Sequence, residues 1–418
     1  MKVAIWHNLP SGGGKRALFY HVRGLRERGH VLESWCPSTA DPKYLPLGDL
    51  ITEHIDRVAV RDIRWPRLRY HELGIAVTIR RRLKAMIEHS RRCARQIEAG
   101  GFDVLFANTC RFFGSPQIGR HTRLPSVLYL GEPYRQLYEA MPRLPWPALS
   151  PDKYSSPYSA RFIRHWVSDW VSLAAMRVQA REELNNAKGF TSILVNSMYS
   201  RESLLRAYGI QAFPCYLGVD TELFVDRHQS RDAFVMGIGS FTRNKNIDFV
   251  IAAMARLKNH PRRLIWVGNI AEDTYIEELR ALALHLDVIL EIKIGVTDVE
   301  IVNLLNHAAV MAYAPRLEPF GLAPLEANAC GLAVVGVAEA GVRESIVNGV
   351  NGLLCEPDPQ AMADAIQRLL DNPAYARELG AAGRGMVESR WSLEAATDRL
   401  ESRLLKAVTH TDRKGSAK

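Results

Sequence analysis

The chain has 418 residues, of which 47% are hydrophobic, and it carries a formal net charge of +9. This length exceeds one ordinary hydrophobic core, so two domains of about 200 residues each are expected, and the apolar share excludes wholesale disorder. The six cysteines are scattered without C-x-x-C spacing and the thirteen histidines show no ligand spacing, so neither a disulfide framework nor a metal site is expected.

No run of residues approaches the roughly 18 apolar positions of a membrane span, and the chain opens directly into a predicted strand. A cleaved signal peptide is therefore not expected, and the sequence predicts a cytoplasmic protein. The positive charge is concentrated in residues 57–95, which implies attraction to an anionic ligand or surface.

Short apolar runs alternate with amphipathic patterns, which is typical of parallel sheets covered by helices. In the first half, the pattern predicts strands at 3–8, 31–36, 104–108, 126–130, 193–196 and 214–219. It predicts helices at 15–28, 71–99, 158–187 and 201–208. The stretch 131–157 is rich in Pro, Tyr and Ser, and we expect a long irregular loop there.

The second half alternates in the same way. Predicted strands lie at 234–239, 264–267, 288–292, 310–314, 333–337 and 352–355, and predicted helices at 247–258, 274–286, 298–307, 320–329, 342–347, 360–370, 374–388 and 392–406. We therefore expect an N-terminal domain over 1–225, a C-terminal domain over 226–390, a helix over 391–407 that crosses back to the first domain, and a flexible tail over 408–418.

The densest chemical pattern follows the predicted strand 310–314. Glu318 leaves the end of that strand, Pro319 breaks the chain, and Gly321 lies where a helix begins. The start of a helix presents unpaired N–H groups that can bind a diphosphate, and glycine lets the ligand approach closely. Glu326 is placed to bind a ribose diol, as acids do in dinucleotide folds. Two glutamates at this spacing are common, but their position after a strand favours the functional interpretation.

Several motifs together resemble glycosyltransferase family 4, whose members are retaining enzymes of the GT-B fold. They are E-P-F-G-L at 318–322 with Glu326, A-G-V-R-E at 340–344, G-I-G-S-F-T-R-N-K-N at 237–246, G-V-D at 218–220, N-S at 196–197, G-G-G at 12–14 and G-E-P-Y-R at 131–135. The resemblance covers most of the chain and is strongest in the second half. It implies an α/β protein with two Rossmann-like domains whose parallel sheets face each other across a cleft.

The resemblance also implies roles for individual residues. Glu318 and Lys245 are the implied catalytic residues, since Glu318 would bind hydroxyls of the donor sugar and Lys245 would neutralise the leaving diphosphate. The implied donor-binding residues further include Gly13, Gly14, Ser240, Arg243, Ile294, Val296, Phe320, Gly321, Leu322 and Glu326. On the acceptor side they are Glu132, Tyr134 and Arg135. The family arginine before the lysine falls on Ser240, with Arg243 as an alternative cation, and the family histidine falls on Gly131.

The implied reaction is retaining transfer of a hexose from a nucleotide-diphosphate sugar to a glycan or lipid-linked acceptor, in synthesis of cell-surface polysaccharide or glycolipid. The sequence has no D-x-D motif, so no metal or other cofactor is expected. Two alternatives remain open. One is a nucleotide-sugar epimerase of the same fold, and the other is a non-catalytic nucleotide-sugar-binding or scaffold protein, motivated by Ser240 and Gly131.

A predicted helix in the first half is strongly basic and amphipathic. It is either a solvated surface or a face that rests on anionic lipid at the inner side of a membrane, and its basic residues are Arg80, Arg81, Arg82, Lys84, Arg91 and Arg92. No recognition motif accompanies this charge, so nucleic acid is not an expected partner. Five aromatic residues are expected to combine core packing with the acceptor-side loop: Trp146, Tyr154, Tyr158, Trp166 and Trp170.

Overall fold

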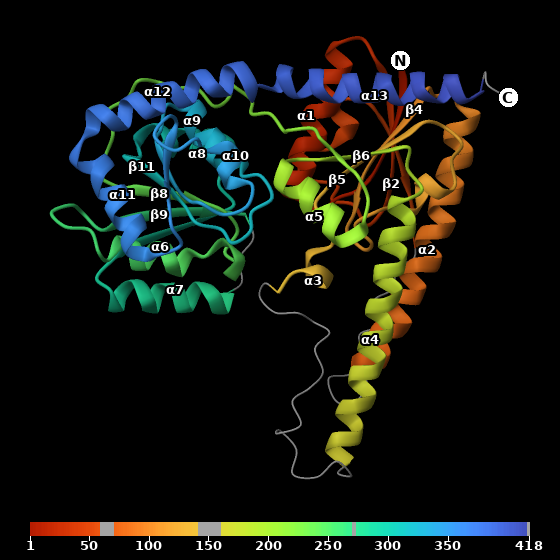
Figure 1. Cartoon of the computed structure of the whole chain (residues 1–418), viewed down its shortest axis with the longest axis horizontal. Helices are drawn as coiled ribbons and strands as arrows, with labels where there is room; N and C mark the ends of the chain where they lie inside the picture. The colour runs from red at the N-terminus through yellow and green to blue at the C-terminus, as the bar shows by residue number, and fades with distance from the viewer. Residues whose placement is uncertain (59–70, 141–159, 270–272, 416–418) are drawn as a thin grey trace. The chain divides into compact units, whose positions relative to one another are not determined.

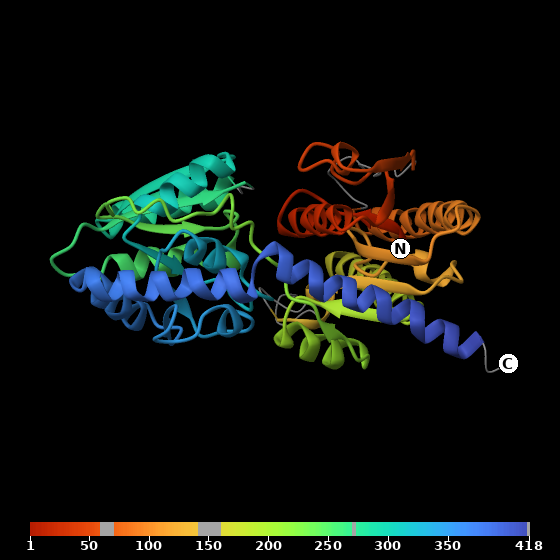
Figure 2. The same ribbon diagram turned by 90° about the horizontal axis from the view of Figure 1, so that it is seen from above.

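The computed structural model describes residues 1–58, 71–140, 160–269 and 273–415, which form two α/β units. Unit 1 comprises Met1–Val195, Arg201–Phe213 and Leu400–Lys418, and unit 2 comprises Asn196–Ser200 and Pro214–Arg399. Each unit is built on one parallel β-sheet (Figure 1, and turned by 90° in Figure 2). The predicted fold class, two α/β units with parallel sheets, is confirmed.

The sheet of unit 1 has seven strands in the order β3-β2-β1-β4-β5-β6-β7. The strands are β1 Lys2–Asn8, β2 Val31–Pro37, β3 Thr52–Asp56, β4 Val104–Cys110, β5 Ser126–Gly131, β6 Ser192–Val195 and β7 Phe213–Pro214. The helices are α1 Gly13–Glu27, α2 His71–Ala99, α3 Arg135–Tyr138, α4 Ala160–Ala187 and α5 Met198–Tyr208, with 3-10 turns η1 Leu47–Asp49 and η2 Gln117–Arg120.

Helices cover both faces of this sheet. On one face, His21 of α1 lies edge-on to Phe106 of β4, with ring centroids 6.1 Å apart. On the opposite face, Trp6 of β1 donates from Nε1 to Nε2 of His89 on α2, at 3.1 Å. Helices α2 and α4 lie side by side (Figure 1). The central strands β1, β4 and β5 are therefore buried on both faces, as is usual in parallel sheets, while the edge strand β3 is more exposed.

The sheet of unit 2 has six strands in the order β10-β9-β8-β11-β12-β13. They are β8 Val235–Ile238, β9 Arg263–Gly268, β10 Ile289–Ile294, β11 Val310–Tyr313, β12 Val334–Val337 and β13 Gly352–Cys355. The helices are α6 Ile247–Met254, α7 Asp273–His285, α8 Asp298–His307, α9 Leu322–Ala329, α10 Val342–Ser345, α11 Pro359–Asp371, α12 Pro373–Arg390 and α13 Leu393–Gly415, with a 3-10 turn η4 Arg243–Lys245.

The chain passes into unit 2 at Pro214, earlier than the boundary expected after residue 225. The reason is that the connecting segment packs on unit 2: the N–H of Val219 donates to the carbonyl of Trp391, and Nη1 of Arg384 donates to the carbonyl of Phe224. The predicted strand 214–219 is accordingly wrong beyond Pro214, since Val219 forms an isolated bridge with Ser392.

The last helix differs from the expectation in length. Helix α13 continues as far as Gly415, so the segment 408–415, expected to be a flexible tail, is helical. Its residues up to Arg399 belong to unit 2 and those from Leu400 belong to unit 1. Among the described residues, none of the helices combines the length and apolarity that crossing a bilayer requires.

Candidate functional site

Two loops that follow neighbouring strands of unit 2 meet at the carboxyl edge of its sheet. Strand β8 leads into residues 239–246 and strand β11 leads into residues 314–321. The N–H of Arg316 donates to the carbonyl of Asn244 at 2.9 Å, which fixes one loop against the other. As a result, Nζ of Lys245 lies 2.6 Å from Oε2 of Glu318, and both side chains are 19% exposed. The two predicted catalytic residues are therefore a partly buried ion pair.

The side chain of Lys245 is held in place by a glycine. A Cβ on Gly239 would lie 3.2 Å from both Cγ and Cδ of Lys245, so the lysine stem lies directly across this position. Nε1 of Trp266 donates to the carbonyl of Gly239 at 2.9 Å, which anchors the surface beneath the stem. The stem of Lys245 thus crosses Gly239, and a larger residue at this position would displace it.

Gly321 lies at the N-cap of α9, as the sequence predicts. Its φ of 90° is in the left-handed region, and a Cβ there would also lie 3.3 Å from Cε1 of Tyr313. Side chains strongly resist such a conformation, so glycine is required at this turn. Without a side-chain cap from Gly321, the first turn of α9 presents the N–H groups and positive dipole end that bind phosphates in other proteins.

A second glycine shapes the turn that carries Glu318. The N–H of Gly341 donates to the carbonyl of Glu318 at 2.9 Å, and a Cβ on Gly341 would overlap the carbonyl of Pro319. Phe320 is buried and forms a cluster with Tyr216 and Trp391, whose ring centroids lie 5.7 and 5.4 Å from its own and 4.9 Å from each other. The turn that carries Glu318 is therefore packed against both Gly341 and this ring cluster.

Glu326 lies on α9 and is half-buried. Burial raises the pKa of Tyr313 well above its usual value, and the charges of Glu318 and Glu326 raise this pKa further. Both carboxylates are thus within electrostatic reach of the Tyr313 hydroxyl.

The remaining predicted donor residues are more dispersed. Oγ of Ser240 lies 3.0 Å from Oγ1 of Thr242 in the loop before Lys245. The guanidinium of Arg243 is paired with Glu278 of α7 at 2.7 Å and is 63% exposed. The last two predicted residues, Ile294 and Val296, lie at and after the end of β10, next to Gly268 of β9, and no described interaction connects them to the Lys245–Glu318 pair.

Sequence reasoning assigned no role to Glu344, although it lies in the resembling motif. Its carboxylate accepts the N–H groups of Met198 and Tyr199, both at 2.9 Å, and the hydroxyl of Tyr216 at 2.8 Å. Burial, followed by the hydrogen bond to Glu344, raises the pKa of Tyr216. Glu344 therefore caps the start of α5 and ties segment 196–200 to unit 2. No local signal reveals this, because 128 or more positions separate Glu344 from each of its partners.

In unit 1, the glycine loop leads into α1. This helix begins at Gly13, and its N-cap, Gly12, has a φ of 130°. A Cβ on Gly12 or Gly13 would meet nothing within 4 Å, so the backbone here is open to a close approach. The following residue, Lys15, is buried, and burial lowers its pKa.

The predicted acceptor-side residues follow β5. Nε of Arg135 lies 3.7 Å from Glu132 and 2.6 Å from Glu139. The N–H of Tyr134 donates to the hydroxyl of Tyr208 at 3.2 Å. These residues are thus anchored within unit 1, on the carboxyl side of the sheet.

A buried carboxyl group supports this loop, and sequence reasoning missed it. The hydroxyl of Tyr208 donates to Glu183 of α4 at 3.1 Å, and the N–H of Ser115 and the side-chain amide of Gln179 donate to the same carboxylate. Burial raises the pKa of Glu183 to about 7. Its neighbours on the same helix face, Gln179 and Asn186, are also polar, so the local sequence resembles an exposed surface and gives no signal of burial.

The basic patch expected on α2 is only partly a free surface. Arg80, Arg81, Lys84 and Arg91 are exposed. Arg82 is half-buried with its guanidinium 4.9 Å from the ring centroid of Phe112, and Arg92 is paired with Asp56 at 2.6 Å. The basic residues between 61 and 69 lie outside the described residues.

The expectation for the five aromatic residues is wrong for two of them. Trp166 and Trp170 of α4 are 60% and 64% exposed, so they do not pack in the core. Trp146, Tyr154 and Tyr158, together with most of the predicted loop 131–157, lie outside the described residues.

Comparison with known proteins agrees with this geometry. The family described as Glycosyl transferases group 1 matches residues 219–386, which include Lys245, Glu318 and Glu326. "Alpha-1,3/1,6-mannosyltransferase ALG2" of Homo sapiens is 28% identical over 180 residues, 40% of this chain and 43% of that protein. The chain thus matches less than half the length of this relative. "Glycogen synthase" of Mycobacterium tuberculosis is 25% identical over 391 residues, 90% of this chain and 87% of that protein.

Among solved structures, Anabaena Alr3699/HepE in complex with UDP and glucose is similar over 97% of this chain and 100% of that chain. The TM-score is 0.67 and the identity is 18%, which supports a common fold. With the two parallel sheets, the similarity over nearly the whole chain shows the GT-B fold, and residues 219–386, most of unit 2, belong to the glycosyl transferases group 1 family (glycosyltransferase family 4).

Proposed function

We propose that this protein is a retaining, metal-independent glycosyltransferase that moves a hexose from a nucleotide-diphosphate sugar to a glycan or lipid-linked acceptor. The observation that carries the proposal is the Lys245–Glu318 pair, 2.6 Å apart, on the turn that leads into the Gly321-capped helix α9. A cation, a carboxylate and the positive end of a helix are thereby gathered at the carboxyl edge of one sheet, where ligands bind in open α/β folds.

The proposed chemistry uses these groups to stabilise the leaving group. The bond between the anomeric carbon and the diphosphate oxygen breaks, and the electron pair leaves with the nucleotide diphosphate. An acceptor hydroxyl oxygen bonds to the same face of the carbon, and its proton passes to the departing phosphate. Lys245 and the N–H groups around Gly321 and Leu322 would bind the developing negative charge.

Glu318 and Glu326 would hold the two sugars of the donor. Glu318 lies before the helix and Glu326 lies on it, so a diphosphate at the start of α9 would have one carboxylate on either side. Carboxylates accept hydrogen bonds from vicinal hydroxyls, which suits both a hexose and a ribose. Gly13, Gly14, Ser240, Ile294 and Val296 remain proposed donor contacts, and Glu132, Tyr134 and Arg135 remain proposed acceptor contacts. Arg243 is not kept among the donor contacts, because its guanidinium is paired with Glu278.

The test is donor turnover. Purified protein is incubated with UDP-, GDP- and ADP-sugars, candidate acceptors and membranes, and both released nucleotide diphosphate and the sugar products are identified. A new glycoside supports the proposal. Binding without turnover would favour the scaffold alternative, and an isomerised sugar without a glycoside would favour the epimerase. Turnover that persists with a chelator supports catalysis by Lys245 without a divalent ion, whereas turnover restored only by added Mg²⁺ or Mn²⁺ would contradict it.

The proposal of a lipid-linked acceptor is based on side chains exposed on the surface of unit 1. Helix α4 exposes apolar side chains at helical spacing: Ile163, Trp166, Val167, Trp170 and Leu173. It lies beside α2, which exposes Arg80, Arg81, Lys84 and Arg91. Exposed tryptophans beside basic residues suit the headgroup region of an anionic membrane.

Vesicle binding tests this part separately from turnover. Binding to vesicles that contain anionic lipid should exceed binding to neutral vesicles and fall as salt is added. Arg80→Gln with Arg81→Gln should remove the anionic preference, and Trp166→Ser with Trp170→Ser should weaken binding to both kinds. Equal binding to the two kinds of vesicle by the unaltered protein would contradict a role for the basic surface.

A further inference from the structure

Three side chains with metal-ligating atoms meet on one face of the unit 1 sheet. Cys36 on β2 lies opposite Ile55 on β3, and Ser34 lies opposite Glu53, so Cys36 and Glu53 project to the same side. His7 on β1 joins them. Its Nε2 lies 3.1 Å from Oε1 of Glu53, and Sγ of Cys36 lies 3.7 Å from the same oxygen. One ligand atom from each residue lies within 4.8 Å of the other two.

We propose that His7, Cys36 and Glu53 bind a divalent cation of the zinc class. Imidazole nitrogen, thiolate sulfur and carboxylate oxygen are the ligands that zinc takes in proteins. With bonds of about 2.0–2.3 Å, a tetrahedral ion holds its ligand atoms about 3.3–3.6 Å apart. The two separations at Glu53, 3.1 and 3.7 Å, lie within a few tenths of an ångström of these values, and the third, between His7 and Cys36, is no more than 4.8 Å.

Charge is compatible with an ion here but does not select it. A dication bound by one thiolate, one carboxylate and one neutral imidazole has no net charge. In the cluster without metal, Lys15, whose side chain is 1% exposed and lies within electrostatic reach of Glu53 and Cys36, balances the carboxylate instead.

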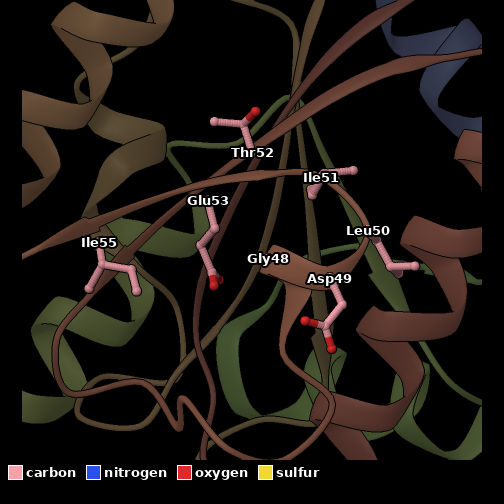
Figure 3. A pocket seen from close by; sticks show the side chains of 7 residues that line it. All are labelled: Gly48, Asp49, Leu50, Ile51, Thr52, Glu53 and Ile55. Atoms are coloured by element: carbon pink, nitrogen blue, oxygen red, sulfur yellow. The ribbon is translucent and has the colours of Figure 1, made fainter.

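One residue of the cluster, Glu53, also borders space that is open to solvent. Glu53 lines an open groove of about 660 Å³ whose other lining residues are Gly48, Asp49, Leu50, Ile51, Thr52 and Ile55. Figure 3 shows the carboxylates of Glu53 and Asp49 directed to the same side of this segment. Glu53 therefore connects the buried Cys36 and His7 to the groove.

The expected role of the ion is structural. Strand β3 is the edge of the sheet, and most of its residues are partly or fully exposed. A cation would tie this strand to β2 and β1 through one ligand from each. The alternative is a metal-free cluster in which the Cys36 thiol donates to Glu53 and Lys15 balances the carboxylate. The metal-bound site and the metal-free cluster differ in whether added metal binds the sulfur of Cys36.

The experiment uses the full chain, stripped with a chelator and titrated with Co²⁺. One Co²⁺ per chain should bind, with the thiolate-to-cobalt charge-transfer absorption that only a cysteine ligand gives. Zn²⁺ should displace the Co²⁺ and raise the melting temperature. Cys36→Ser should abolish the charge-transfer band, and Glu53→Gln should weaken Zn²⁺ binding by at least about tenfold, because each removes one of three ligands.

The matched control is Cys93→Ser. Sγ of Cys93 also lies near a histidine, 3.6 Å from Nε2 of His89, but on the opposite face of the sheet and outside the proposed site. This variant should keep the band and the affinity. Absence of a thiolate band in the unaltered protein would overturn the proposal without any variant, and so would a band that survives Cys36→Ser or disappears with Cys93→Ser.

Discussion

Lys245 and Glu318 are 73 positions apart in the chain, yet their charged groups are 2.6 Å apart in unit 2. Each is 19% exposed, so this pair is more shielded than a surface salt bridge and remains reachable by a ligand. An arriving diphosphate would share the ammonium group with Glu318. The ion pair thus holds the ammonium group of Lys245 in position before a ligand binds.

Two replacements of Glu318 should slow the reaction to different extents. Glu318→Ala removes both the proposed contact with the donor sugar and the partner that positions Lys245, so kcat/KM for nucleotide diphosphate release should fall by about 10²–10³-fold. Glu318→Gln keeps a hydrogen-bonding group of the same size, so its kcat/KM should fall less. Steady-state kinetics measure both. Equal kinetics for Glu318→Ala and the unaltered protein would remove this residue from the site.

Gly239→Ala should disturb Lys245 without touching either charge. The new Cβ would lie 3.2 Å from Cγ and Cδ of the lysine, so the stem must shift by a few tenths of an ångström. Such a shift should lower kcat by about 3–10-fold and leave the fold intact. Kinetics and thermal melting, measured side by side, check this. Unchanged kcat would show that the position of the stem is not limiting.

Gly341→Ala should be much more harmful. Its Cβ would overlap the carbonyl of Pro319, so the backbone that carries Glu318 must move, with a loss of about 1–3 kcal/mol in the free energy of unfolding. Denaturation by urea and donor kinetics should both report the change.

Gly385→Ala on α12 is the matched control for this substitution. A Cβ there meets nothing within 4 Å, and alanine should stabilise the helix by about 0.5–1 kcal/mol. If the two substitutions had the same effect on stability, the tight packing of Gly341 against the Glu318 turn would not be supported.

Glu183 should make the stability of the chain depend on pH. Burial raises its pKa from 4.5 to about 7, so between these values the folded protein keeps a proton that the unfolded chain has lost. Its contribution is complete below pH 4.5 and is lost as the pH rises through 7. Relative to Glu183→Gln, the free energy of unfolding of the unaltered protein should fall by about 2–3 kcal/mol between about pH 5 and pH 8.

The comparison with Glu183→Gln is needed because buried histidines titrate in the opposite sense. Burial lowers the pKa of His7 and His89, so their contribution rises with pH in the acidic range. The difference between the two proteins at each pH isolates Glu183. A difference that stays constant across this range would show that Glu183 is ionised throughout.

The sequence predicted the fold and the core of the site where the signal is local. Strands such as β11 are continuous apolar runs because a parallel sheet buries both faces, and the turn from Glu318 to Gly321 is contained in four consecutive residues. The edge strand β3 was missed because its sequence, Thr-Glu-His-Ile-Asp, is mostly polar and partly exposed, so it lacks the apolar run.

Relationships over long distances were not predictable. Nothing near Glu344 indicates that it caps residues 198 and 199, and His7, Cys36 and Glu53 come from three strands without any metal-binding spacing. Arg243 looked like a second cation for the donor by its nearness to Lys245 in sequence, yet its guanidinium turns to Glu278 of α7. Side-chain direction depends on packing that a motif does not contain.

The most direct test of the proposed donor site is the turnover of Lys245→Met compared with Arg243→Gln. Methionine keeps the apolar stem across Gly239 and removes the charge, while Arg243→Gln removes a nearby cation that is already paired with Glu278. Release of nucleotide diphosphate from the preferred donor should fall at least about 100-fold in Lys245→Met and less than about threefold in Arg243→Gln. Equal turnover in Lys245→Met and the unaltered protein would contradict the account.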